Sequence, residues 1–153
     1  MIRTIAWATL VAGTLDILSA FVWSALAGGE LGGILPTVAS GPFGDGVPAG
    51  GAGQLLGLLV HFAIMAVMVA VYVLTASRIP ALNRYWWIAG PLYGVVLWIV
   101  MYWVVMPLRW ESYTTPSEAL PILKQLISHC LLTGLPIAWI IARWRPAIRP
   151  SYI

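Results

Sequence analysis

Three ionisable side chains lie inside long apolar runs of the chain: Asp16, His61 and His129. Asp16 is central to residues 5–27, a run that spans about 34 Å as a helix and so matches a hydrocarbon core of roughly 30 Å. A carboxylate at this depth is costly in free energy and marks a candidate functional site. Small and polar residues, Ser19 among them, share its helical face. We therefore expect Asp16 to point into a protein interior rather than into lipid.

The helical rise places these three side chains at similar depths. Counted from one side of the membrane, His61 and His129 lie about 10 and 12 Å deep, and Asp16 lies about 16 Å deep. In a four-helix bundle all three can face one cavity, with the acid about one helical turn below the imidazoles. His61 shares its helical face with Met65 and Met68. Further polar residues expected at this centre are Ser19, Gln54, Gln125 and Thr133.

Three kinds of chemistry remain open for such a centre. Its hydrogen bonds can be purely structural and fix the register of the helices, at about 0.6 kcal/mol each in one measured membrane protein. It can pass a proton or a cation along Asp16, His61 and His129, as intramembrane acids do in pumps and carriers. It can also hold a cofactor, with His61 and His129 binding a haem or one of them binding a magnesium pigment.

Other chemistry fits the sequence less well. A metal site made of both histidines and Asp16 lacks a recognisable ligand spacing, and the acid lies deeper than the imidazoles. The chain contains no nucleophile elbow, phosphate-binding loop or zinc-protease motif, so we do not expect an enzyme. The single cysteine, Cys130, lies within an apolar run, where neither a disulfide nor a thiolate metal site is expected.

The composition predicts the elements that must position these side chains. Of the 153 residues 61% are hydrophobic and only 8% are charged, which excludes an ordinary soluble domain. A basic patch with interleaved aromatic residues is missing, so nucleic acid is not an expected partner. Four apolar runs are each near the length of a transmembrane helix, at about 5–27, 54–77, 86–106 and 121–142. We predict an all-α integral membrane protein whose residues 1–153 form one transmembrane domain in the lipid bilayer.

The charges predict the orientation. With four spans, six basic residues fall on one side, against two on the other. This bias predicts that both termini are cytoplasmic. The six are Arg3, Arg78, Arg84, Arg143, Arg145 and Arg149, and the two are Arg109 and Lys124.

The external connection between the first two spans is unusual. Residues 28–53 contain ten glycines and three prolines, which argues against a continuous helix. Residues 31–39 are nonetheless apolar, and structureless loops of this length are uncommon in small proteins. We predict an irregular lid that dips into the outer leaflet as a short re-entrant or interfacial helix and covers the mouth of the bundle. The alternative is a disordered external loop whose apolar residues touch the headgroups.

Small residues predict where helices approach closely. Gly53 with Gly57, and Gly90 with Gly94, form two pairs at the small-xxx-small spacing, and Gly13 lies on the face of Asp16. Together with nine tryptophans and almost no soluble part, these seams favour a non-enzymatic accessory or assembly subunit. Its expected partner is a second copy or a larger membrane complex. The alternatives are a proton- or cation-linked transporter or channel, and a haem or pigment protein.

Several short motifs resemble a group of small bacterial inner-membrane proteins that are distantly similar to the YagU-like proteins. They are Gly13-Thr-Leu-Asp16, Gly57-Leu-Leu-Val-His61-Phe, Tyr93-Gly94 with Val104-Val-Met-Pro-Leu108, and His129 followed by Gly134-Leu-Pro-Ile-Ala138. The resemblance implies a protein of the bacterial inner membrane with four helices, with an acid in the first and histidines in the second and fourth, and it implies no activity. Tyr102 stands where an asparagine is expected in the third helix of such proteins.

Overall fold

The computed structural model describes residues 2–144, and this part of the chain is almost entirely helical. Four helices are long and apolar enough to cross a membrane, which confirms the predicted all-α fold with four candidate spans. The first two spans are the single helices α1 and α3, whereas the third and fourth are each built of consecutive segments. The segments are α1 (Ile2–Leu26), α2 (Ile34–Phe43), α3 (Gly51–Arg78), α4 (Ala81–Arg84), α5 (Trp86–Ile99), η1 (Val100–Val105), α6 (Met106–Arg109), α7 (Ala119–Leu126), η2 (Ile127–Gly134) and α8 (Leu135–Arg143).

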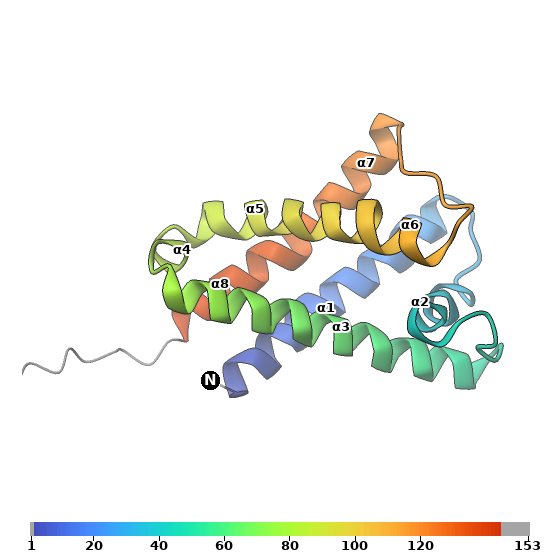
Figure 1. The fold of residues 1–153 in the computed structure, drawn as a ribbon, viewed down its shortest axis with the longest axis horizontal. Helices are drawn as coiled ribbons and strands as arrows, with labels where there is room; N and C mark the ends of the chain where they lie inside the picture. Colours follow the sequence, from blue (N-terminus) through green and yellow to red (C-terminus); the bar gives the residue numbers. More distant parts are fainter. Residues whose placement is uncertain (1, 145–153) are drawn as a thin grey trace, which may run out of the picture.

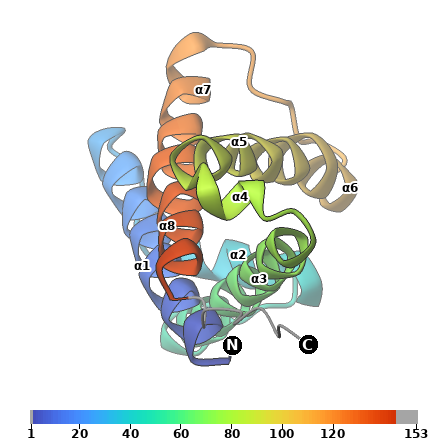
Figure 2. The same ribbon diagram turned by 90° about the vertical axis from the view of Figure 1, so that its left-hand side faces the viewer.

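The fourth span, α7–η2–α8, is the centre of the bundle (Figure 1). It packs against α1 on one side and α5 on the other, and α8 also touches α3 and α4. Short α4 joins α3 to α5 at one end of the molecule, which we call the α4 end, whereas α2 lies at the opposite end, the α2 end (Figures 1 and 2). The positive-inside pattern predicts that the α2 end is external. Two of the arginines behind that prediction, Arg145 and Arg149, lie outside the described residues.

The hydrophobic core fills the half of the bundle nearer the α4 end. It combines small side chains of α1 with larger ones of α3 and α8, so that the three helices interdigitate. In the most apolar 18-residue window of each span, between 22% and 39% of the residues are buried within the protein. Most residues of each span are therefore left to face outward, as contact with lipid requires. The core residues are Ala8, Ala12, Met65, Val69, Tyr72, Ala76, Ile137, Ala138, Ile140 and Ile141.

The glycines predicted to permit close helix packing make their contacts with other segments of the same chain. A Cβ at Gly94 would collide with the backbone of His129 and Cys130, and one at Gly90 would come within 2.7 Å of the Leu135 Cα atom. Gly134, which was not among the predicted packing glycines, lies on the fourth span and contacts the backbone of Gly90 and Gly94. These close approaches hold α5 against η2 and α8.

The other predicted packing glycines serve α1 and the lid. A Cβ at Gly57 would overlap the backbone of Leu35 in α2, and one at Gly53 would overlap the carbonyl of Pro48. A Cβ at Gly13 would lie 2.8 Å from a ring carbon of Phe62. All five predicted packing glycines therefore make intramolecular contacts and do not by themselves indicate a partner protein.

The connection between α1 and α3 contains a ten-residue helix, α2, which overlaps the apolar stretch where a short helix was predicted. Pro36 is tolerated because it lies in the first turn, where backbone N–H groups have no intrahelical acceptor, and Pro42 lies in the last turn. Gly44 then ends the helix with a φ of +76°, a conformation that favours glycine. The contact with Gly57 places α2 about 9 Å along α3 from its start, beside the apolar part of that span.

Two stretches of π-helix interrupt the third and fourth spans. η1 ends just before Pro107, and η2 ends just before Pro136. A proline has no N–H and its ring crowds the carbonyl of the preceding turn, so the backbone widens there instead of keeping the α-helical pattern. These wide turns carry Tyr102 and His129, one on each side of the region described next.

Candidate functional site

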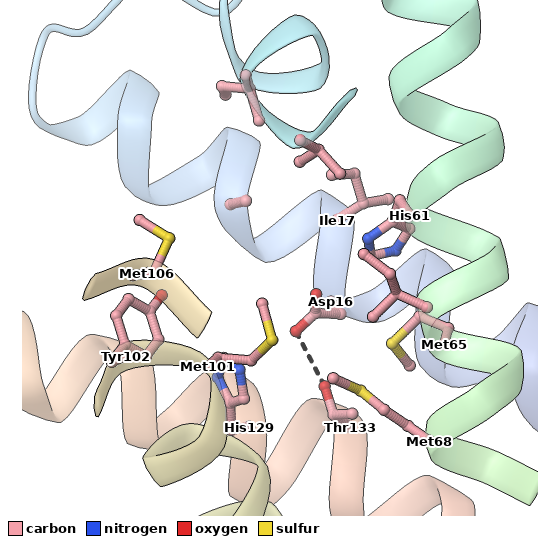
Figure 3. A pocket seen from close by; sticks show the side chains of 14 residues that line it. Asp16, Ile17, His61, Met65, Met68, Met101, Tyr102, Met106, His129 and Thr133 are labelled. Carbon is pink, nitrogen blue, oxygen red and sulfur yellow. Dashed lines mark hydrogen bonds between the residues drawn. The ribbon is translucent and has the colours of Figure 1, made fainter. Parts of the chain in front are cut away.

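A cavity of about 190 Å³ lies between α2 and the hydrophobic core (Figure 3). Asp16, His61 and His129 all line it, so the structure brings the three predicted side chains of three different spans together. Tyr102 and Thr133 complete its polar lining. The third span thus contributes a hydroxyl, at the position where the family resemblance left a polar role in question.

Asp16 is the half-buried acid of this cavity. Its Oδ1 atom accepts a hydrogen bond from the Thr133 hydroxyl at 3.0 Å. The other carboxylate oxygen has no hydrogen-bond donor among residues 2–144, and Asp16 forms no ion pair in this part of the chain. Figure 3 shows the carboxyl group directed into the space between His61 and Thr133. One oxygen of a deeply placed carboxyl is therefore left for a proton, a water molecule or a cation.

Both histidines are fixed by a backbone carbonyl through one ring nitrogen. His61 is only 7% exposed, and its Nε2 atom lies 2.8 Å from the Gly13 carbonyl oxygen. His129 uses Nδ1, which lies 3.0 Å from the Gln125 carbonyl oxygen. Because a carbonyl only accepts hydrogen bonds, the bonded nitrogen carries the proton. In the neutral rings Nδ1 of His61 and Nε2 of His129 then keep a free lone pair.

Ser19 and Gln125 belong to a second cavity of about 350 Å³, which also borders Asp16 and His129. The Ser19 hydroxyl bonds the hydroxyl of Ser128 and the carbonyl of Asp16, each at 2.7 Å, and the indole of Trp23 donates to Ser128 at 3.0 Å. Sequence reasoning missed Ser128, although its helical spacing of three from Gln125 placed it on the same face. These hydroxyls tie α1 to the fourth span beside the acid.

Gln54 does not join the centre, which corrects the prediction that it would. Its side chain is exposed, and Gly32 of the connection lies close to it, since a Cβ there would be 3.9 Å from the amide nitrogen. Two helical turns separate Gln54 from His61 on one face of α3. Helical spacing alone therefore favoured the assignment of Gln54 to the polar centre. Gly57 lies between these two residues in sequence, and the backbone of Leu35 in α2 packs against it.

A larger cavity of about 770 Å³ lies under α2 and leads toward the α2 end. Glu30 and Arg109 line it, and Arg109 also donates to the Ser40 carbonyl at 2.8 Å and pairs with Asp45. This cavity adjoins the one at Asp16, because both are lined by Ile34, Val38, Ile64, Met101 and Met106. The two cavities thus share a wall of apolar side chains.

Toward the α4 end the region below Asp16 is packed. The rings of Tyr72 and Tyr93 lie 5.1 Å apart, and the Tyr93 hydroxyl donates to the Met68 carbonyl at 2.7 Å. Val69 and Ile137 beside them are fully buried. Side chains of three spans therefore separate the cavity from the α4 end.

The cavity does not fit the predicted alternative of a haem or a pigment. Sites for drug-sized ligands measure about 300–1,000 Å³, and a porphyrin is a ligand of that size. The 190 Å³ between His61 and His129 is too small for such a macrocycle. Among residues 2–144 no three His, Cys, Asp or Glu side chains gather as a metal site.

Comparison of the chain with protein-family models, with curated proteins and with solved structures finds no match. The resemblance to the YagU-like proteins stays a prediction. Function must therefore be argued from the geometry of the cavities.

Proposed function

We propose that this small multi-pass membrane protein is a transporter or channel that takes up a proton or another cation at Asp16. The observation that carries the proposal is the carboxylate oxygen of Asp16 that has no donor among residues 2–144 and borders a cavity, which shares a wall with the larger cavity beside α2. A carboxylate within a membrane-spanning segment is stabilised by a nearby positive charge or by a proton. A cation that enters the cavity supplies that positive charge.

The charges along the two approaches favour the route under α2. Glu30 lines that approach, and Asp45 offsets the positive charge of Arg109 there. The other approach is lined by Lys124, whose ammonium lies 5.6 Å from the centre of the Trp23 ring. A cation is repelled by Lys124 and attracted by Glu30, so the path beneath the lid is the more favourable one.

Release toward the α4 end requires the packed tyrosines to separate. Tyr72 and Tyr93 are therefore the proposed inner gate, with Val69 and Ile137 around them. Two discrete packings of such a gate, one closed and one open, are what alternating access needs. The packing described here is the one closed toward the α4 end.

The accessory-subunit prediction loses one of its supports. Its glycine seams are used inside the chain, against η2, α8, α2 and Phe62. It stays a prediction that purification in mild detergent tests, because a protein that elutes only as a monomer argues against it.

Flux measurements in liposomes test the transport proposal. The wild-type protein should carry protons or monovalent cations down a gradient, and Asp16→Asn should abolish that flux. The substitution keeps an oxygen acceptor for the Thr133 hydroxyl, so the fold should persist. Glu111→Gln is the matched control, because it removes an exposed carboxylate from the connection of residues 110–118 and should leave flux unchanged. Absence of flux in the wild type, or undiminished flux in Asp16→Asn, overturns the proposal.

A further inference from the structure

The methionines of this chain gather at one place. Of the five methionines, four lie within the described residues, and all four line the cavity at Asp16: Met65, Met68, Met101 and Met106. The first two come from α3, whereas the other two come from the third span on the far side of the cavity (Figure 3). Thioether sulfur is a soft ligand, and soft ligands favour copper(I) over harder cations.

Each histidine has one ring nitrogen bonded to a backbone carbonyl, as metal-binding histidines usually do. A metal-binding imidazole usually donates its other N–H to a carbonyl or carboxylate, which fixes the ring and its tautomer. His61 and His129 each have such a bond, to Gly13 and Gln125 respectively, and each ring lines the cavity. The remaining nitrogen of each ring is then free to bind a metal ion.

We propose that the cavity binds copper(I), through thioethers from both of its walls and a free imidazole nitrogen of His61 or His129. Asp16 supplies the negative charge that balances the ion. This inference rests on the proposed function and names the cation that Asp16 takes up.

Harder cations fit the same lining poorly. Calcium and magnesium require about six oxygen ligands, and here the side-chain oxygens are those of Asp16, Thr133 and Tyr102. Zinc favours four nitrogen, thiolate or carboxylate ligands, and among residues 2–144 no three such side chains are placed so that they could hold one metal ion. A cavity of about 190 Å³ holds a single ion without requiring the lid to move.

The test measures copper(I) binding by the full-length protein in detergent, by competition with a coloured copper(I) chelator. We expect one ion per protein, and an affinity reduced at least tenfold in the double variant Met68→Leu/Met101→Leu. Leucine keeps the volume and apolarity of methionine, so the metal-free variant should unfold at an unchanged temperature. X-ray absorption of the loaded protein should show sulfur neighbours of copper, and fewer of them in the double variant.

Cys130 provides the matched control, because it is the chain's only thiol and does not line the cavity at Asp16. Cys130→Ser should bind copper(I) as the wild type does. Loss of binding in Cys130→Ser, or unchanged binding in Met68→Leu/Met101→Leu, overturns the inference and leaves the methionines as gap-filling core residues.

The experiments can refute the copper(I) site and the transport function independently of each other. Copper(I) binding without any cation flux in liposomes refutes the proposed function but supports the site. Proton flux that depends on Asp16, in a protein that binds no copper(I), supports the proposed function and refutes the site.

Discussion

At Gly94 the backbone of α5 lies against the backbone of η2, and Gly94→Ala tests both this close approach and the placement of His129. An added Cβ would lie 2.6 Å from the carbonyl carbon of His129 and closer still to that carbonyl oxygen and to the Cys130 Cα atom. These are backbone atoms, so no side-chain rotation relieves the collision. The helices must separate by about 0.8 Å to bring even the carbonyl carbon to 3.4 Å, where ordinary contacts begin.

The free-energy cost follows from two opposing terms. Overpacking in a well-packed core costs typically about 1–3 kcal/mol, and a collision between two backbones belongs at the upper end. Alanine recovers about 1 kcal/mol because it favours the helix more than glycine does. We expect a net loss of about 2 kcal/mol in the free energy of unfolding. Because the displaced residue is His129, copper(I) affinity or cation flux should fall as well.

The assay is reversible unfolding in mixed micelles, with Gly41→Ala as the control. Gly41 lies in α2, where an added Cβ would meet nothing within 4 Å. This second glycine-to-alanine change should leave stability unchanged or raise it by up to about 1 kcal/mol. Substitutions at unpacked sites usually change the free energy of unfolding by no more than about 0.5 kcal/mol. A change as small as that in Gly94→Ala would show that the helices are not in backbone contact there. An equal loss in Gly41→Ala would show that the seam is not the cause.

Two further predictions concern stability. Thr9→Val should keep or raise the thermal unfolding temperature, because the buried Thr9 hydroxyl has no hydrogen-bond partner among residues 2–144; a lower temperature would reveal a partner. Arg109→Gln should loosen the lid and speed proteolysis within residues 44–50, because it removes both the bond to Ser40 and the pair with Asp45. Asp45→Asn should change proteolysis little, since its side chain is 86% exposed and such ion pairs contribute about 0–1 kcal/mol. Equal effects of the two variants would contradict the role of the Ser40 bond.

The four long helices and the meeting of Asp16, His61 and His129 at one cavity could be predicted because they follow from the length of the apolar runs and the helical rise. Each apolar run is close to the thickness of a bilayer, and the spans begin or end within a few residues of their predicted bounds. A fixed rise per residue then places Asp16, His61 and His129 near one level. Small residues beside Asp16 indicated the inward face of α1, where Gly13 and Ser19 are buried.

Features that depend on tertiary packing could not be predicted in this way. The glycines and prolines of residues 28–53 disfavour a helix locally, yet Leu35 of α2 packs against Gly57 of α3. Gln54 was wrongly assigned to the centre because helical spacing does not show that its side chain is exposed or that α2 packs on α3 at Gly57. Met101 and Met106 precede Pro107, and the π-helical widening there changes the residues per turn on which any face assignment depends.

The proposed cation site also explains why some side chains of the polar centre are fully hydrogen-bonded whereas Asp16 is not. A purely structural centre gains most when its polar side chains are paired with one another. Ser19, Ser128 and Trp23 meet that condition through their mutual hydrogen bonds. Asp16 does not, although two histidines line the same cavity, because their N–H groups are held by the carbonyls of Gly13 and Gln125. An arrangement that withholds those donors from the acid and presents lone pairs and thioethers beside it is suited to a cation rather than to a closed hydrogen-bond network.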